Sequence, residues 1–257
     1  MLSSASDTYA AQALLTDKGV LAARRAWRLG RIDRLTATLV MLMISAARQS
    51  TESLDAMIAA QGLDAPPEAQ VVTTAFGRSA SDGRSLTGLL EQANSLTLLE
   101  SMVVTQIADS GRVAAGVALT ARPKLDGYVR NVGPKCCSRC AILAGRFYRW
   151  SDGFLRHPKC RCTNVPTTNG EASRIIESPV DLFRQGRITD LSRADTKAIK
   201  DGADIARVVN VRRDAAGLDQ TSRVIARSGR LMPEGIYLLA GSRNEALDLL
   251  IQNGFIL

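Results

Sequence analysis

The chain has 257 residues, of which 46% are hydrophobic and only 4% are aromatic. This length gives one large domain or two ordinary ones with a substantial core, and the hydrophobic share excludes an intrinsically disordered chain. Lysine and arginine outnumber aspartate and glutamate by 33 to 25, and the net charge of +8 favours contact with a polyanion or an acidic protein surface. An ordinary basic surface exposed to solvent is the alternative explanation for this excess of positive charge.

From about residue 8 to residue 60 the sequence has almost no helix breakers, and it predicts one long helix or two in succession. Apolar residues recur at helical intervals, as in Leu35, Leu39 and Ala46. The most apolar stretch, residues 39–47, is far shorter than the roughly 20 residues of a membrane-spanning helix. We therefore expect a core helix and no membrane span.

Three arginines in this stretch, Arg24, Arg28 and Arg31, stand three or four residues apart, so they share one face of a predicted helix. Such a stripe is a candidate contact with DNA or with an acidic partner protein. An ordinary solvated helix face is an equally good interpretation.

Further along the chain, Pro66 and Pro67 predict a turn, followed by a helix over about 67–79. A Ser/Gly-rich joint at 79–85 precedes a second helix over about 86–109. The run 113–121 is either the tail of that helix or a strand, and Pro123 ends it.

All five cysteines and the only histidine lie between Cys136 and Cys162. The segments 128–132 and 147–150 around them alternate like short strands, and 141–144 is predicted as a helical turn. This region therefore predicts a small mixed module with a knuckle at Cys137–Cys140.

The spacing of these residues predicts one tetrahedral Zn²⁺ site. A C-x2-C turn places two sulfurs on the same side of a tight loop, and the remaining ligands follow after a segment of 16 residues. Four-coordinate zinc cannot use five sulfurs and one imidazole. We expect the ligands to be Cys137, Cys140, His157 and one of Cys160 or Cys162, with Cys136 as the spare.

A disulfide pair, or buried thiols beside a core histidine, are the alternatives to a metal site. Disulfides need an oxidising compartment, whereas the sequence starts without the basic residues and apolar run of a secretory signal. Adjacent Cys136 and Cys137 also make a poor disulfide framework. We therefore expect a metal site in a reducing compartment.

Beyond Pro166 the sequence predicts helices again. Ser192 with Asp195 and Ser242 with Glu245 fit the S-x-x-D/E pattern of a capped helix start. Gly254 stands where a left-handed C-terminal cap is expected.

The predicted fold class is mainly α with a small α+β zinc-knuckle module. By sequence pattern the chain divides into a helical N-terminal region, 1–111, the zinc-knuckle module with its short strands, 112–170, and a helical C-terminal region, 171–257.

Catalytic patterns are missing from the sequence. If His157 binds metal, a Ser–His or Cys–His hydrolase has no base. There is no phosphate-binding glycine loop, no H-E-x-x-H and no Glu-x-Glu pair, and the aspartates of the C-terminal region show no convergence. We expect a protein that is not an enzyme, with a structural zinc ion rather than a catalytic one.

The cysteine segment resembles a known signature. The C-x2-C pair, an L-x-G at 143–145, an aromatic residue at Tyr148 and the ending HPKCRC at 157–162 resemble the phage Mu F-like minor head proteins, also called phage head morphogenesis proteins. The versions from tailed phages of actinobacteria are the most similar. Segments 208–213 and 230–257 resemble the C-terminal part of those proteins, so the resemblance covers roughly residues 112–257.

This resemblance implies a minor capsid protein present in few copies, assembled in the cytoplasm of a bacterial host and located in the capsid interior of the virion, near the portal. Its implied partners are the portal protein and the major capsid protein, and it would assist head assembly and accompany the DNA during packaging or ejection. Cys136 departs from the single cysteine that the family has at this place. The metal ligands that the resemblance implies are Cys137, Cys140, His157, Cys160 and Cys162.

Two other functions are alternatives to this one. The first is a zinc-containing, non-specific DNA-binding protein, whose arginine-rich face would bind the phosphates of packaged phage DNA. A metal-dependent nuclease or maturation protease is the second, and the lack of a free base or of a carboxylate cluster argues against it.

Overall fold

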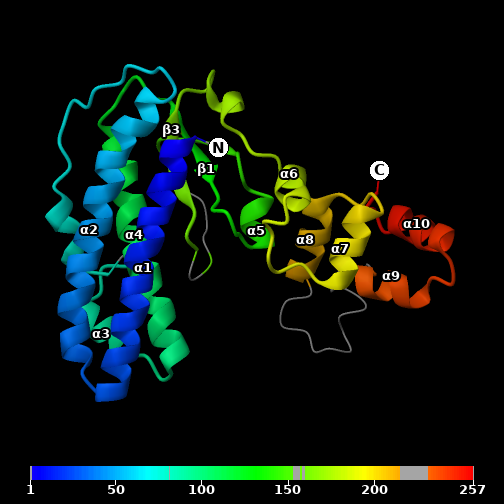
Figure 1. Ribbon diagram of the computed structural model, residues 1–257, viewed down its shortest axis with the longest axis horizontal. Coiled ribbons are helices and arrows are strands. Elements are labelled where there is room, and N and C mark those ends of the chain that lie inside the picture. Colours follow the sequence, from blue (N-terminus) through cyan, green and yellow to red (C-terminus); the bar gives the residue numbers. More distant parts are fainter. Residues whose placement is uncertain (1, 81, 153–156, 158–159, 215–230, 257) are drawn as a thin grey trace. The chain divides into compact units, whose positions relative to one another are not determined.

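The computed structural model describes residues 2–80, 82–152, 157, 160–214 and 231–256. These residues form a mainly helical protein with a small three-stranded sheet and a cysteine cluster, which confirms the predicted fold class (Figure 1). The chain divides into two compact units. The first consists of Met1–Gly133 and Ala144–Glu177, and the second of Pro134–Leu143 and Ser178–Leu257. The three-part division at residues 111 and 170 stays a prediction.

The first unit begins with two long helices, α1 (Ser3–Leu29) and α2 (Ile32–Ala59). Gly30 separates them because it adopts a left-handed conformation with φ 62°, which costs glycine little. Of the two arrangements that the sequence allows, two helices in succession is therefore the one that forms. Leu35 and Leu39 lie buried between them, as the helical period predicts.

A third long helix, α4 (Leu96–Thr120), packs against α1 and α2 (Figure 1). The predicted helix over 86–109 is in fact two helices, because the short α3 (Leu86–Leu90) ends before Ser95, which is extended. The Ser95 hydroxyl caps the new helix by accepting a hydrogen bond from the Leu98 amide at 3.3 Å. Most of the run 113–121 is the tail of α4, so the strand alternative is wrong.

The predicted helix over 67–79 is also wrong. The described residues there contain only a 3-10 helix, η1 (Thr73–Gly77). Four consecutive β-branched residues, 71–74, have little freedom in a helix, which weakens the helical tendency of this short segment. The segment is instead held to the helices, with the Glu68 amide donating to the Ala121 carbonyl at 2.8 Å.

The sheet has the order β2-β1-β3, and both neighbours run antiparallel to the buried central strand β1 (Gly127–Asn131). Strands β1 and β2 (Phe147–Arg149) were predicted to within about one residue, whereas β3 (Thr163–Thr167) was missed. Pro166 argues against a strand in a sequence, but β3 lies at the edge of the sheet, where a missing N–H can be tolerated.

The sheet packs on the ends of the long helices. Tyr128 of β1 and Val165 of β3 share a buried core with Leu54, Met57 and Leu119. The contact places β3 and the residues just before it against the helices.

Two glycines of the first unit should respond in opposite ways to alanine. A Cβ at Gly127 would overlap the Tyr148 carbonyl and lie 2.9 Å from the Arg149 Cα, so Gly127→Ala should destabilise this unit by about 1–3 kcal/mol. Gly116, inside α4, has no such neighbour within 4 Å, and Gly116→Ala should stabilise by about 0.5–1 kcal/mol. Urea unfolding followed by tryptophan fluorescence measures both, since Trp27 and Trp150 lie in this unit. Equal effects of the two substitutions would contradict the strand packing.

The second unit is built from short helices. They are α5 (Ser138–Ala141), α6 (Pro179–Arg184), α7 (Arg193–Lys200), α8 (Ile205–Asp214), α9 (Pro233–Leu239) and α10 (Arg243–Gln252). Their core includes Val208, Met232, Ile236, Leu250 and Phe255. None of the described helices of either unit combines the length and the apolar character that a membrane crossing requires.

Local capping signals of the second unit are confirmed. Ser192 and Asp195 form a reciprocal capping box at the start of α7, and the Ser242 hydroxyl accepts from the Glu245 amide at 3.1 Å. Gly254 has the expected left-handed conformation, with φ 68°. Gly202, at φ 105°, separates α7 from α8.

An ion-pair network joins α7, α8 and α9, with Asp195 buried and the other two charged side chains partly exposed. The Arg212 guanidinium binds the carboxylates of Asp195 and Glu234, and its Nη2 donates to the Ser192 hydroxyl at 2.6 Å. The Asp195 side chain is fully buried. Arg212 therefore supplies the positive charge that keeps a buried carboxylate compensated.

Candidate metal centre

The Cys137–Cys140 knuckle is the single turn of α5. Cys137 is the residue before the helix, and its Sγ accepts a hydrogen bond from the Cys140 amide at 3.4 Å. This bond folds the C-x2-C segment tightly enough to turn both sulfurs toward one side, as the spacing predicts.

The knuckle is fastened by residues about fifty positions later in the sequence. The Cys136 amide donates to the Arg187 carbonyl at 2.9 Å, and the Thr189 amide donates back to the Cys136 carbonyl at 3.0 Å. Asp190 accepts from the Ser138 amide at 2.6 Å and from its hydroxyl at 3.2 Å. The turn is thus held by backbone pairing and by a carboxylate cap.

Cys160 and Cys162 lie just before β3, and both are buried. The Cys160 amide donates to the His157 carbonyl at 3.2 Å. Pro158 and Lys159, which complete the HPKCRC ending, lie outside the described residues.

Five side chains form a cluster that could hold a metal ion. The donor atoms of Cys137, Cys140 and His157 lie within 4.8 Å of one another, and so do those of Cys140, Cys160 and Cys162. A tetrahedral ion with Zn–S bonds of about 2.3 Å brings its sulfur ligands about 3.8 Å apart, so this spacing fits such an ion.

Sulfur and imidazole are the ligands that zinc prefers, which makes the donor set chemically suitable for Zn²⁺. Cys140 belongs to both groups of donors. Cys136 belongs to neither, and its described interactions include the backbone bonds to the strand-like segment 187–189. None of the five cysteines, all within the described residues, is in a disulfide bond.

Two buried arginines contact the Cys160–Cys162 segment, and neither was singled out in the sequence. Arg112 of α4 donates to the carbonyl oxygens of both cysteines, and Arg130 of β1 donates to both of their sulfurs. These contacts join residues 30 to 50 positions apart. No local pattern marks them, because the fold alone brings them together.

The predicted arginine stripe does not lie on one helix face, because α1 ends before Arg31. Arg24 lies on α1, where its Nε donates to Glu100 of α4 at 2.7 Å, whereas Arg31 lies beyond the end of α1 and precedes α2. The hydrogen bonds from Arg31 lower the pKa of the Asp33 carboxyl to about 2. Arg28 is exposed in the last turn of α1. Contact of these arginines with DNA or a partner protein stays a prediction.

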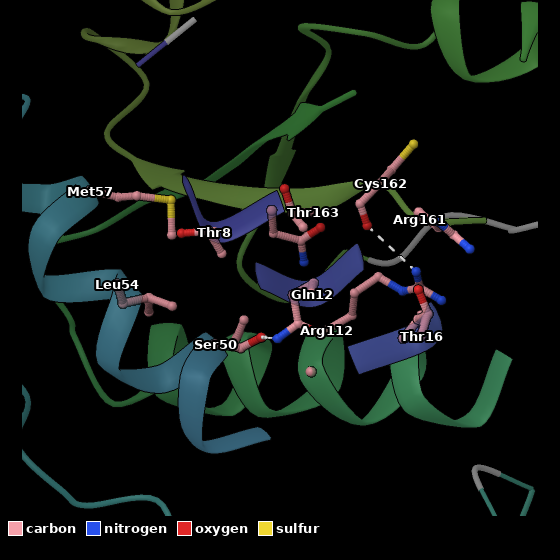
Figure 2. A pocket seen from close by; sticks show the side chains of 14 residues that line it. Thr8, Gln12, Thr16, Ser50, Leu54, Met57, Arg112, Arg161, Cys162 and Thr163 are labelled. Atoms are coloured by element: carbon pink, nitrogen blue, oxygen red, sulfur yellow. Dashed lines mark hydrogen bonds between the residues drawn. The ribbon is translucent and has the colours of Figure 1, made fainter. Parts of the chain in front are cut away.

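A small, partly open cavity lies beside the cysteine segment, between α1, α2, α4 and the start of β3 (Figure 2). Gln12 projects toward it and donates to the Ser50 hydroxyl at 3.0 Å and to the Ala46 carbonyl at 2.9 Å. The cavity measures about 20 Å³. This volume holds about one water molecule, so the cavity is too small for a substrate.

The geometry thus brings together the predicted metal ligands from three short segments, and it adds two arginines that contact one of those segments. Comparison of this chain with protein-family models, curated proteins and solved structures finds no significant match.

Proposed function

We propose that this chain is a minor capsid protein of a tailed phage, a head morphogenesis protein of low copy number whose cysteine cluster binds a structural Zn²⁺ ion. The observation that carries the proposal is the convergence of Cys137, Cys140, His157, Cys160 and Cys162. It gives a physical basis to the segment that resembles the Mu F-like minor head proteins.

The ligand set supports a structural ion rather than a catalytic one. A catalytic zinc ion keeps a coordination position open for water or substrate, whereas five candidate ligands can close the shell. When bound, the ion would link segments whose regular structure is short, since α5 spans four residues and β2 three. Metal binding would supply the folding free energy that such short elements lack.

The proposed site of action is the capsid interior near the portal, with the portal protein and the major capsid protein as partners. Cryo-electron microscopy of intact particles, with the chain carrying a small fused tag, tests this directly. Density for the tag beside the portal at low copy number is the expected result. Purified particles that lack the chain altogether would contradict the proposal.

Non-specific DNA binding is a second candidate function, and one observation favours it. Arg25, Arg28 and Arg34 are exposed around the α1–α2 junction and make no ion pair with any other described residue. Guanidinium groups without an ion-pair partner at one end of a helical hairpin can contact phosphates of a nucleic acid backbone.

Replacing Arg25, Arg28 and Arg34 with alanine should weaken DNA binding at low salt and reduce the slope of log K against log salt by about 3, one for each lost phosphate contact. Gel-shift titration at several salt concentrations measures this slope.

The matched control for that experiment replaces Arg174, Arg184 and Arg193, which are exposed and lie elsewhere. It removes the same net charge and should leave the slope nearly unchanged. A wild-type protein that does not bind DNA even at low salt would exclude the second candidate and leave the first untouched.

A further inference from the structure

The Cys160–Cys162 segment has almost no regular structure of its own, yet its side chains and backbone are tied to the first unit at three points. Arg112 holds the two carbonyl oxygens, Arg130 holds the two sulfurs, and Arg161 pairs with Asp17 of α1 at 2.8 Å. All three contacts lie within this unit.

Arg112 is well placed to fix the backbone. Its Nη1 donates to the Cys160 carbonyl at 2.6 Å and to the Cys162 carbonyl at 3.5 Å, and Figure 2 shows the side chain reaching from α4 toward Cys162. Its Nη2 binds Asp109, one helical turn earlier on α4. The Arg112 side chain is only 7% exposed, and Cys160 and Cys162 are buried as well. A charged donor in such a place makes strong hydrogen bonds.

Arg130 acts on the sulfurs of the same segment. Its Nη2 lies 3.6 Å from the Cys160 Sγ and 3.7 Å from the Cys162 Sγ. Two sulfurs that contact one nitrogen atom converge on one point. Alternate residues of an extended chain face the same side, which is how a C-x-C segment achieves this.

We propose that Arg112 is a positioning residue of the metal site, which holds the Cys160–Cys162 backbone in the geometry that the ion requires before the ion binds. This inference rests on the proposed zinc site and deepens it. Arg112 touches neither sulfur in the described contacts, so it acts through the cysteine backbone, while Arg130 directs the sulfurs. The first unit thereby orders the Cys160–Cys162 part of the site before the ion binds.

Ordering of the Cys160–Cys162 segment before the ion binds should raise the affinity for zinc. A ligand segment that is already ordered loses less conformational entropy when the ion binds, so the affinity is higher. Residues that orient metal ligands from outside the coordination shell typically change metal affinity about 10- to 100-fold when they are replaced. We expect an effect of this size for Arg112.

The experiment measures zinc affinity of the full chain by competition with a chelator of known affinity. Arg112→Met should raise the dissociation constant about 10- to 100-fold. Arg112→Lys keeps the charge but has only one nitrogen atom, so it cannot bind Asp109 and the cysteine carbonyls with separate nitrogens as the guanidinium does. Its zinc affinity should fall between that of Arg112→Met and that of the wild type. If Arg112→Met does not fold, Arg112→Lys and Asp109→Asn test the same contact with smaller changes.

Arg122 provides the matched control. It is also a buried arginine at the end of α4, donating to the Ala118 carbonyl at 2.7 Å and to Asp55 at 2.6 Å, and these partners lie away from the cysteines in the sequence. Arg122→Met should lower the stability of the unit and leave zinc affinity unchanged. Absorption spectra of the Co²⁺-substituted proteins should show the same coordination in the wild type and in both variants.

Equal weakening of zinc binding by Arg112→Met and Arg122→Met would overturn the inference, because it would mean that stability alone controls the affinity. Unchanged affinity in Arg112→Met would overturn it as well. A wild-type chain that binds no zinc would overturn the proposed metal site itself, which is a separate and recognisable result.

Discussion

Cys140→Ser is expected to remove zinc from the protein, because Cys140 belongs to both groups of candidate ligands. Structural zinc sites bind with roughly 10–16 kcal/mol, so one of four ligands contributes on the order of 3 kcal/mol. Its loss should weaken binding by more than about 100-fold. The wild-type protein should carry about one zinc ion per chain in native mass spectrometry, and the variant should carry none after dialysis.

The thermal stability of the protein should depend on the bound zinc ion. A strong chelator should lower the melting temperature of the wild-type protein and increase amide exchange in the 136–162 segment, because the proposed metal binding would be coupled to folding there. The Cys140→Ser variant should already show both changes, and the chelator should have no further effect on it.

Cys136→Ala is the control for this experiment. Cys136 is buried next to the knuckle but belongs to neither donor group, and its backbone bonds do not depend on its sulfur. We expect this variant to keep its zinc. Loss of zinc from Cys136→Ala, or melting of the wild type that is indifferent to the chelator, would show that the ligand assignment is wrong.

Arg212→Met is expected to destabilise the second unit by about 3–5 kcal/mol, which is a large fraction of the stability of a small domain. The substitution leaves the Asp195 carboxylate, which is fully buried, without its positive partner. It also removes the donor to Ser192, the residue that caps α7. Hydrogen exchange of the amides in α7 and α8 measures the loss in this unit separately from the first one.

Two further variants separate charge from packing. Arg212→Met combined with Asp195→Asn should recover part of the loss, because the uncompensated charge is gone. Lys197→Met removes a more exposed partner of Asp201 in the same unit and should cost no more than about 1 kcal/mol. Similar losses for Arg212→Met and Lys197→Met would contradict the role given to the buried pair.

The features that the sequence predicts well are local ones. The left-handed conformation of Gly254, the capping box of Ser192 and the knuckle at Cys137–Cys140 each depend on a few neighbouring residues. Their physical causes are backbone conformation, helix capping and ligand spacing. Each of these depends on residues within a few positions of one another, so the sequence alone predicts them.

The features that the sequence does not predict depend on distant contacts. Pro166 argues against β3 until its strand is known to lie at an edge, and residues 67–79 fail as a helix partly because they lie against the long helices. Arg112 is 48 positions from Cys160, and no pattern connects them. The cysteine and histidine cluster was therefore predictable from spacing, while the arginines that contact two of its cysteines were not.

The short segment Pro134–Leu143 belongs to the second unit although residues of the first unit both precede and follow it. During synthesis the knuckle leaves the ribosome about fifty residues before Arg187, Thr189 and Asp190, which fasten it. An incomplete chain that ends before these positions cannot hold the knuckle closed by these bonds. The order of translation therefore delays closure of this turn until residues 187–190 have been made, early in the second stretch of this unit. Because each unit consists of two separate stretches of chain, no single cut can separate the units into two intact fragments.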